Sequence, residues 1–143
     1  MISFFAPMEP PETTAQQQKR LTVRGGHARA YTGAKGIAAN EALDFAFHTF
    51  APKTPLTGPI CLSLIITWPP KKCDINTKVK RLRFLGGNHI SHVRKPDCDN
   101  AMKAILDSLQ RLGFFTDDKQ ICKAIIEKRI STTPGIAVEL SQI

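Results

Sequence analysis

Apolar side chains recur with helical spacing between Gly36 and Phe50. They stand at positions 38, 42, 45, 46 and 50, and prolines follow at 52 and 55. This pattern predicts an amphipathic helix that ends before the prolines, because a proline interior to a helix removes a backbone donor and clashes with the preceding turn.

A second helical pattern occupies residues 100 to 112 and has two clearly different sides. The apolar side is formed by Met102, Ile105, Leu106, Leu109 and Leu112, and the polar side by Asn100, Lys103, Asp107 and Gln110. Both sets recur every three or four residues, which is typical of a helix with one buried face. Asp99 is predicted to cap its beginning, and Gly113 is predicted to follow its last residue.

Four apolar runs predict β-strands. The run Ile60 to Trp68 is rich in β-branched residues and stops at two prolines, so it is predicted to be a strand buried on both faces. The other three runs are 2–5, 121–130 and 136–140. In chain order the elements predict an α/β or α+β fold with a small mixed sheet packed with two main helices.

The length of 143 residues fits a single domain over 1–143, since domains average roughly 150 residues. No apolar run approaches the ~20 residues that a membrane-spanning helix needs. The first residues carry no positive charge before their apolar positions, unlike a secretory signal. The sequence thus predicts a cytoplasmic, nucleoid-associated protein that binds no membrane. The four cysteines form no C-x-x-C pair and are predicted to be reduced thiols.

The charge of the chain is strongly basic and unevenly distributed. Lys and Arg number 20 against 12 Asp and Glu, a formal net charge of +8, which favours an acidic partner such as nucleic acid. Residues 19–35 contain five Lys or Arg and no acid around Gly25-Gly26, predicting a cationic loop or hairpin. Residues 71–95 contain eight Lys or Arg and one acid, and Gly86-Gly87-Asn88 is a candidate hairpin turn there.

The carboxylates around the second helix carry the candidate chemistry. If residues 97 to 99 are extended, Asp97 and Asp99 lie on the same side of the chain. Lys103 stands one helical turn after Asp99, and Asp117-Asp118 follow the predicted helix end. Mg²⁺ prefers oxygen ligands and keeps several waters, and a lysine ammonium neutralises charge on a phosphate in the transition state. These residues therefore indicate a magnesium-dependent phosphodiester hydrolase, with Mn²⁺ as a substitute metal.

Purely structural roles are an alternative interpretation of the same residues. Asp99 alone is explained as a helix cap, Lys103 with Asp107 as a surface ion pair, and Asp117-Asp118 as a turn. A zinc site at His89, His92 and Cys98 is a weaker interpretation, because these residues lack the spacing of zinc ligands. Gly25-Gly26 lacks the lysine and spacing of a phosphate-binding loop, and no organic cofactor is predicted.

The sequence resembles the RusA-type Holliday junction resolvases in three adjoining motifs. The family pattern K-P-D-x-D-N-x-x-K stands at residues 95–103, D-x-L at 107–109 and D-D-x-Q-I at 117–121. The resemblance implies a RusA-like fold and a homodimeric, Mg²⁺-dependent endonuclease that nicks four-way DNA junctions symmetrically. It implies that Asp97, Asp99 and Asp118 (rather than Asp117) bind the metal and that Lys103 is the catalytic lysine. A bacterial or prophage setting is expected with it.

The candidate DNA-binding residues are basic side chains of the two cationic stretches. They are Arg20, Arg24, Arg29, Lys80, Arg81, Arg83, Arg94 and Lys95. Two other functions are compatible with this sequence: a branched-DNA-binding protein that does not cleave, and a nuclease of the same chemistry that acts on flaps or forks.

Overall fold

The computed structural model describes residues 1–14 and 19–143. Their contacts divide the chain into two compact units. The sheet unit comprises residues 1–10, 56–94 and 119–143, and the helix unit comprises residues 11–55 and 95–118. The fold class is mixed α+β, as predicted, whereas the assignment of residues 1–143 to one domain stays a prediction.

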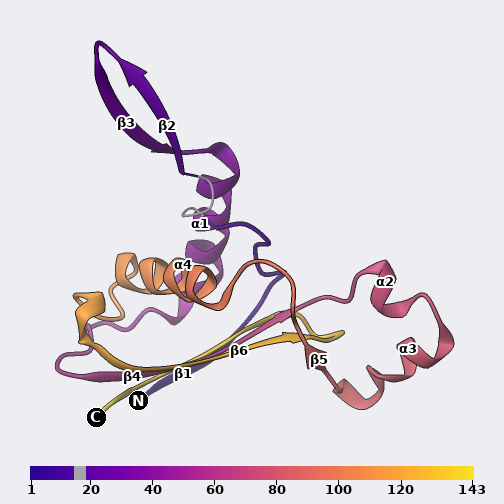
Figure 1. The fold of residues 1–143 in the computed structure, drawn as a ribbon. Coiled ribbons are helices and arrows are strands. Elements are labelled where there is room, and N and C mark those ends of the chain that lie inside the picture. The colour runs from indigo at the N-terminus through magenta and orange to yellow at the C-terminus, as the bar shows by residue number, and fades with distance from the viewer. Residues whose placement is uncertain (15–18) are drawn as a thin grey trace. The chain divides into compact units, whose positions relative to one another are not determined.

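The sheet unit is built on five strands in the order β1-β7-β4-β6-β5. Their bounds are β1 Ile2–Pro7, β4 Ile60–Trp68, β5 Ile90–Ser91, β6 Ile121–Ile130 and β7 Gly135–Gln142. The long strands β4 and β6 run parallel, and all other pairs are antiparallel (Figure 1). This arrangement confirms the predicted mixed sheet.

The central strand β4 has two different faces. Its even-numbered side chains from Ile60 to Trp68 are all at most 3% exposed, and the strand pairs along its length with β6 on one edge and β7 on the other. Cys61, Ser63 and Ile65 on the other face are half-buried. The prediction of a strand buried on both faces is therefore wrong for these three residues, whereas Thr67 on the same face is buried.

The basic segment between β4 and β6 folds into short elements. They are the helices α2 (Lys72–Ile75) and α3 (Lys78–Leu82), the 3₁₀ turn η2 (Leu85–Gly87) and strand β5. The Oγ1 of Thr77 accepts a hydrogen bond of 3.2 Å from the backbone N–H of Lys80 and so caps α3. The hairpin predicted at 86–88 is wrong, because no strands of the described residues pair across this turn. Gly86 and Gly87 do have positive φ angles of 68° and 80°, and the N–H of Asn88 bonds to the carbonyl of Leu85 at 3.3 Å.

The helix unit contains a hairpin and two 14-residue helices. Strands β2 (Lys19–Arg24) and β3 (His27–Thr32) pair across Gly25 and Gly26, whose φ angles of 57° and 78° suit a two-residue hairpin turn. This confirms the hairpin predicted for the first cationic stretch. The helices are α1 (Ala34–Phe47), followed by the 3₁₀ turn η1 (His48–Phe50), and α4 (Cys98–Arg111).

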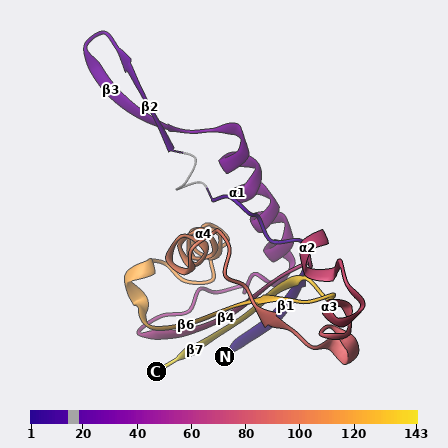
Figure 2. The ribbon, with the colours of Figure 1, turned by 45° about the vertical axis from the view of Figure 1, so that its right-hand side comes forward.

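Helices α1 and α4 cross and contact each other (Figure 2), and one acidic residue of α1 bonds to α4. The carboxylate of Asp44 on α1 accepts hydrogen bonds from Ser108 Oγ at 2.5 Å and from the Arg111 guanidinium at 2.8 and 3.0 Å. Ser108 is fully buried, so this contact anchors the second half of α4. No local sequence pattern predicts this contact, since Asp44 lies 64 residues before Ser108.

Two further expectations concern the whole chain. The four cysteines form no disulfide, and their reduced state stays a prediction. Among the described residues, no helix combines the length and apolar character needed to span a membrane.

Candidate active site

Helix α4 begins one residue after Asp97. Asp97 is the N-cap, with an extended backbone (φ −69°, ψ 158°), and its carbonyl accepts the first helical hydrogen bond from the N–H of Ala101 at 3.0 Å. The predictions that 97–99 is extended and that Asp99 caps the helix are therefore wrong. Asp is among the residues preferred as a helix N-cap, which explains the position of Asp97. Asp99 lies in the first turn of the helix, where the positive end of the helix dipole stabilises its negative charge.

The side-chain carboxylate of Asp97 does not cap α4. It accepts no capping hydrogen bond from the described residues of α4, although Asp at this position commonly does so. Asp97 and Asp99 are both exposed. Two exposed carboxylates thus stand at the beginning of α4, and Asp99 does not have the capping role that the simpler interpretation assigned to it.

Lys103 is the centre of the site in the helix unit. Its Nζ lies 2.9 Å from Asp107 Oδ1 and 2.8 Å from Asp118 Oδ2. The Asp107 contact is the i,i+4 ion pair expected from the sequence, but the Asp118 contact joins residues 15 positions apart. Hydrogen bonds to Asp118 and then to Asp107 raise the pKa of Lys103 above its ordinary value of 10.5. The ammonium is therefore fully charged at neutral pH.

The end of α4 returns the chain toward Lys103. The N–H of Gly113 bonds to the carbonyl of Gln110 and the N–H of Phe114 to that of Leu109, both at 3.0 Å. This is a Schellman motif with glycine at φ 79°, so the predicted position of Gly113 is confirmed. The Nε2 of Gln110 then donates to the carbonyl of Thr116 at 3.2 Å, which holds the turn before Asp118.

Of the two adjacent acids at 117 and 118, Asp118 has a defined contact in the site. Asp118 contacts Lys103, and it begins the 3₁₀ turn η3 (Asp118–Gln120). Next to this contact, Asp107, Gln110, Arg111 and Thr116 line a pocket of about 400 Å³. No group of three or more His, Cys, Asp or Glu side chains placed to hold a metal ion occurs within residues 1–14 and 19–143.

The basic side chains of the segment between β4 and β6 differ in their surroundings. Arg94 bonds to the nearly buried Asp74 at 2.5 Å, while Lys80 and Arg81 donate to the carbonyls of Cys73 and Ile75 at 2.9 and 3.1 Å. Arg83 and Lys95 are exposed. Arg94, predicted as a DNA contact, thus holds the fold of the sheet unit together in the described structure.

We expect the substitution Asp74→Asn to lower the free energy of unfolding by about 1.5–3 kcal/mol at pH 7. Burial opposes ionisation of Asp74, but hydrogen bonds from Arg94 and the Lys71 N–H lower its pKa overall, below 3.8. A lowered folded-state pKa stabilises the fold above the unfolded-state pKa, and this stabilisation is lost as the pH falls through the folded-state value. Urea unfolding from pH 7 to pH 3 should therefore show the difference from wild type shrinking with acid. A constant difference contradicts the ion-pair role, and Glu139→Gln serves as the control.

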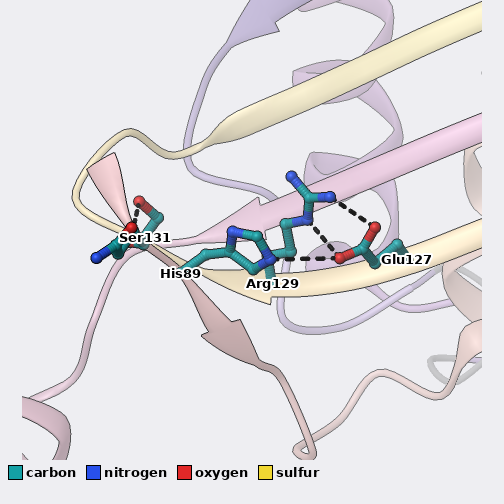
Figure 3. A network of polar contacts seen from close by, with 5 residues as sticks. His89, Glu127, Arg129 and Ser131 are labelled. Atoms are coloured by element: carbon teal, nitrogen blue, oxygen red, sulfur yellow. Dashed lines mark hydrogen bonds and ion pairs between the residues drawn. The ribbon is translucent and has the colours of Figure 1, made fainter. Parts of the chain in front are cut away.

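The two histidines of the weaker zinc interpretation have other contacts. The buried ring of His92 stacks on Trp68 with 4.3 Å between ring centroids. The Nε2 of His89 lies 3.5 Å from Glu127 Oε1, and Figure 3 shows His89 beside the Glu127–Arg129 pair of β6. Burial, and then the nearby Lys128 and Arg94 charges, lower the pKa of His92, so it is neutral at pH 7.

Acidic side chains around one lysine, on a basic α+β protein, are typical of enzymes that hydrolyse nucleic-acid phosphodiesters. The comparisons with known proteins agree with this class. The sequence model of the family described as Endodeoxyribonuclease RusA matches residues 10–141. The chain therefore belongs to the RusA endodeoxyribonuclease family. A Bacillus subtilis (strain 168) protein described as "Uncharacterized protein YqaN" is 26% identical over 132 residues, which cover 92% of each chain.

Proposed function

We propose that this protein is a divalent-metal-dependent endonuclease that resolves four-way DNA junctions by paired, symmetric cuts. The observation that carries the proposal is the contact of Lys103 with Asp118 and Asp107. It joins motifs that lie apart in the sequence of a chain belonging to an endodeoxyribonuclease family. The net charge of +8 supports a polyanionic substrate.

Asp97, Asp99 and Asp118 are the proposed metal ligands. Their carboxylate oxygens are the donors that Mg²⁺ and Mn²⁺ prefer. Asp97 and Asp99 are exposed at the beginning of α4, and Asp118 already pairs with a cationic group. A bound divalent ion supplies an activated water and neutralises charge on the scissile phosphate.

Lys103 is the proposed electrostatic catalyst. Its raised pKa keeps the ammonium charged, and the two carboxylates restrict where this long side chain reaches. A cation fixed in this way stabilises the additional negative charge that develops on the phosphate oxygens during hydrolysis. Asp107 is a positioning residue in this proposal, since it holds Lys103 from one helical turn away.

The β2–β3 hairpin is the proposed DNA-contacting element of the helix unit. In its register Arg20 lies opposite Tyr31 and Arg29 opposite Thr22, so Arg20, Arg24, Arg29 and Tyr31 share one face of the ribbon. Arg20, Tyr31 and Lys35 also line a pocket of about 460 Å³. One basic face on a two-stranded ribbon is suited to contacts with DNA phosphates.

We expect the combined substitution of Arg20, Arg24 and Arg29 by alanine to weaken junction binding and to reduce its salt dependence. Each lost phosphate contact lowers the log–log slope by about 0.9, so three lost contacts lower it by about 2.7. Binding measured in Ca²⁺ over a range of salt concentrations tests this. Lys53→Ala, at an exposed lysine outside the predicted set, should leave the slope unchanged. An unchanged slope in the triple variant means that the hairpin does not contact DNA.

A cleavage assay with three substrates tests the proposed function. The wild-type protein is titrated with Mg²⁺ on a synthetic four-way junction, a fork and a linear duplex of the same sequence. The proposal expects metal-stimulated nicks at symmetric positions in two strands of the junction. Tight junction binding without cleavage supports a binding protein instead, and faster cleavage of the fork supports a fork or flap nuclease.

A further inference from the structure

Strand β6 has an open outer edge along most of its length. It pairs with β4 over nine residues on one side, but on its other side the short strand β5 reaches only Arg129 and Ile130. One more hydrogen bond, from the N–H of His92 to the carbonyl of Lys128, extends this contact. Among the described residues, no strand pairs with the outer edge over 121–127, and an edge of this kind is a template for another strand.

The residues of this edge are exposed to an unusual degree for a ten-residue strand. Cys122, Lys123, Ala124 and Ile125 are all exposed in succession, and 51% of Ile125 is accessible. An exposed central isoleucine on an unpaired strand favours association. The opposite edge of the sheet, β1, is shorter and ends at Pro7, which limits pairing there.

We propose that the β6 edges of two copies of this chain pair antiparallel around a two-fold axis at Ile125, forming one continuous sheet across a homodimer. In this register Ile125 lies opposite its own copy, and Lys123 lies opposite Glu127 of the second copy. The two-fold axis repeats this pair, so the interface contains two opposite-charge pairs on one sheet face. The strand is self-complementary in charge, which is what an isologous interface requires.

Neighbouring side chains orient the Glu127 carboxylate for the proposed contact with Lys123 of the second copy. Arg129 binds its two carboxylate oxygens at 2.5 and 2.7 Å, and His89 lies 3.5 Å from Oε1 (Figure 3). The carboxylate is held in one orientation and has remaining lone pairs for a lysine. Edge lysines alone discourage pairing, but here Lys123 meets a carboxylate at the matching position. The inference goes beyond the proposed nuclease by naming the surface that joins its two subunits.

Sedimentation equilibrium of the full chain and its charge variants tests the interface. Wild type is expected at twice the chain mass of 15.8 kDa. Lys123→Glu or Glu127→Lys alone places like charges opposite each other twice, which should raise the dimer dissociation constant about tenfold or more. The combined variant restores opposite charges and should return to within about threefold of wild type. Lys123→Glu leaves the Arg129 contact intact, so its effect does not depend on local repacking around Glu127.

Glu139→Lys is the matched control, because Glu139 is exposed on strand β7, which β4 separates from β6. Hydrogen exchange gives a second readout: the amides of 121–127 should exchange slowly in the dimer and rapidly in the single charge variants. A wild type that stays at 15.8 kDa, or a dimer that all variants leave unchanged, overturns the interface. If the protein is a monomer that nicks junctions, the proposed β6 interface is wrong and the proposed function stands. If it is a β6 dimer without metal-stimulated cleavage, the proposed nuclease function is wrong and the interface stands.

Discussion

The substitution Asp99→Asn is expected to abolish junction nicking in Mg²⁺, by about 10³-fold or more, while junction binding in Ca²⁺ stays within about twofold of wild type. Asparagine keeps the size of the side chain but removes the negative charge that a divalent cation requires. Asp99 lies in the first turn of α4 without capping it, so the helix itself should lose only about 0.3–1 kcal/mol of dipole stabilisation.

Single-turnover cleavage of a labelled four-way junction measures this effect, with thermal unfolding of the same preparation as a check on the fold. Glu41→Gln is the matched control, because Glu41 is an exposed carboxylate on α1 outside the proposed site. Full nicking by Asp99→Asn would refute the assignment of this residue as a metal ligand. Equal losses in both variants would also contradict a specific role of Asp99 in cleavage.

Replacing Lys103 by alanine should lower the rate of the cleavage step about 10²–10³-fold at saturating junction, with little change in junction affinity. The ammonium contacts both Asp107 and Asp118, and its loss removes a fixed positive charge from the proposed phosphate site. The same loss frees Asp118 from a competing cation. Half-saturation of the remaining activity by Mg²⁺ should therefore shift to a lower concentration, because the site becomes more negative.

Two further variants distinguish the effect of the positive charge at residue 103 from the effect of where that charge is held. Lys103→Arg keeps a positive charge but presents it as a planar group, and it should recover only part of the rate. Asp107→Asn keeps Lys103 but removes one of its two carboxylate partners, so it should lower the rate less than Lys103→Ala. If Lys103→Ala weakens junction binding as strongly as it weakens cleavage, Lys103 is a DNA contact and not a catalyst of the chemical step.

Local patterns in the sequence predicted the long elements well. The two-sided pattern of residues 100–112 corresponds to α4, and the glycine at 113 ends it as expected. The hairpin around Gly25-Gly26 and the strand at 121–130 also agree with the structure. These features depend on side-chain periodicity and on backbone angles that glycine adopts easily, and both are properties of short segments.

The predictions for the start of α4 and for residues 86–88 were wrong because each segment is compatible with two local structures. Asp97 and Asp99 are both suitable helix caps, and the structure uses Asp97, which moves Asp99 from an extended segment into the helix. Gly86-Gly87-Asn88 forms a tight turn with positive φ at both glycines, but the segments on its two sides do not pair as a hairpin. Such choices depend on where the flanking chain must go, and a turn motif carries no information about that.

The sequence by itself determined the positions of the two long helices, the hairpin, the basic character of the chain and the motifs that resemble a nuclease family. The face predicted to be apolar on α1 is wrong, because positions 38, 42 and 45 are exposed and the helix buries Gly36, Ala39, Leu43 and Phe47. Only the tertiary structure decided that Asp118 meets Lys103, that Asp44 anchors α4 and that Arg94 is held by Asp74. The physical reason is that these contacts join residues 15 to 67 positions apart. Their formation depends on how the chain closes its loops and buries its side chains, which no local periodicity encodes.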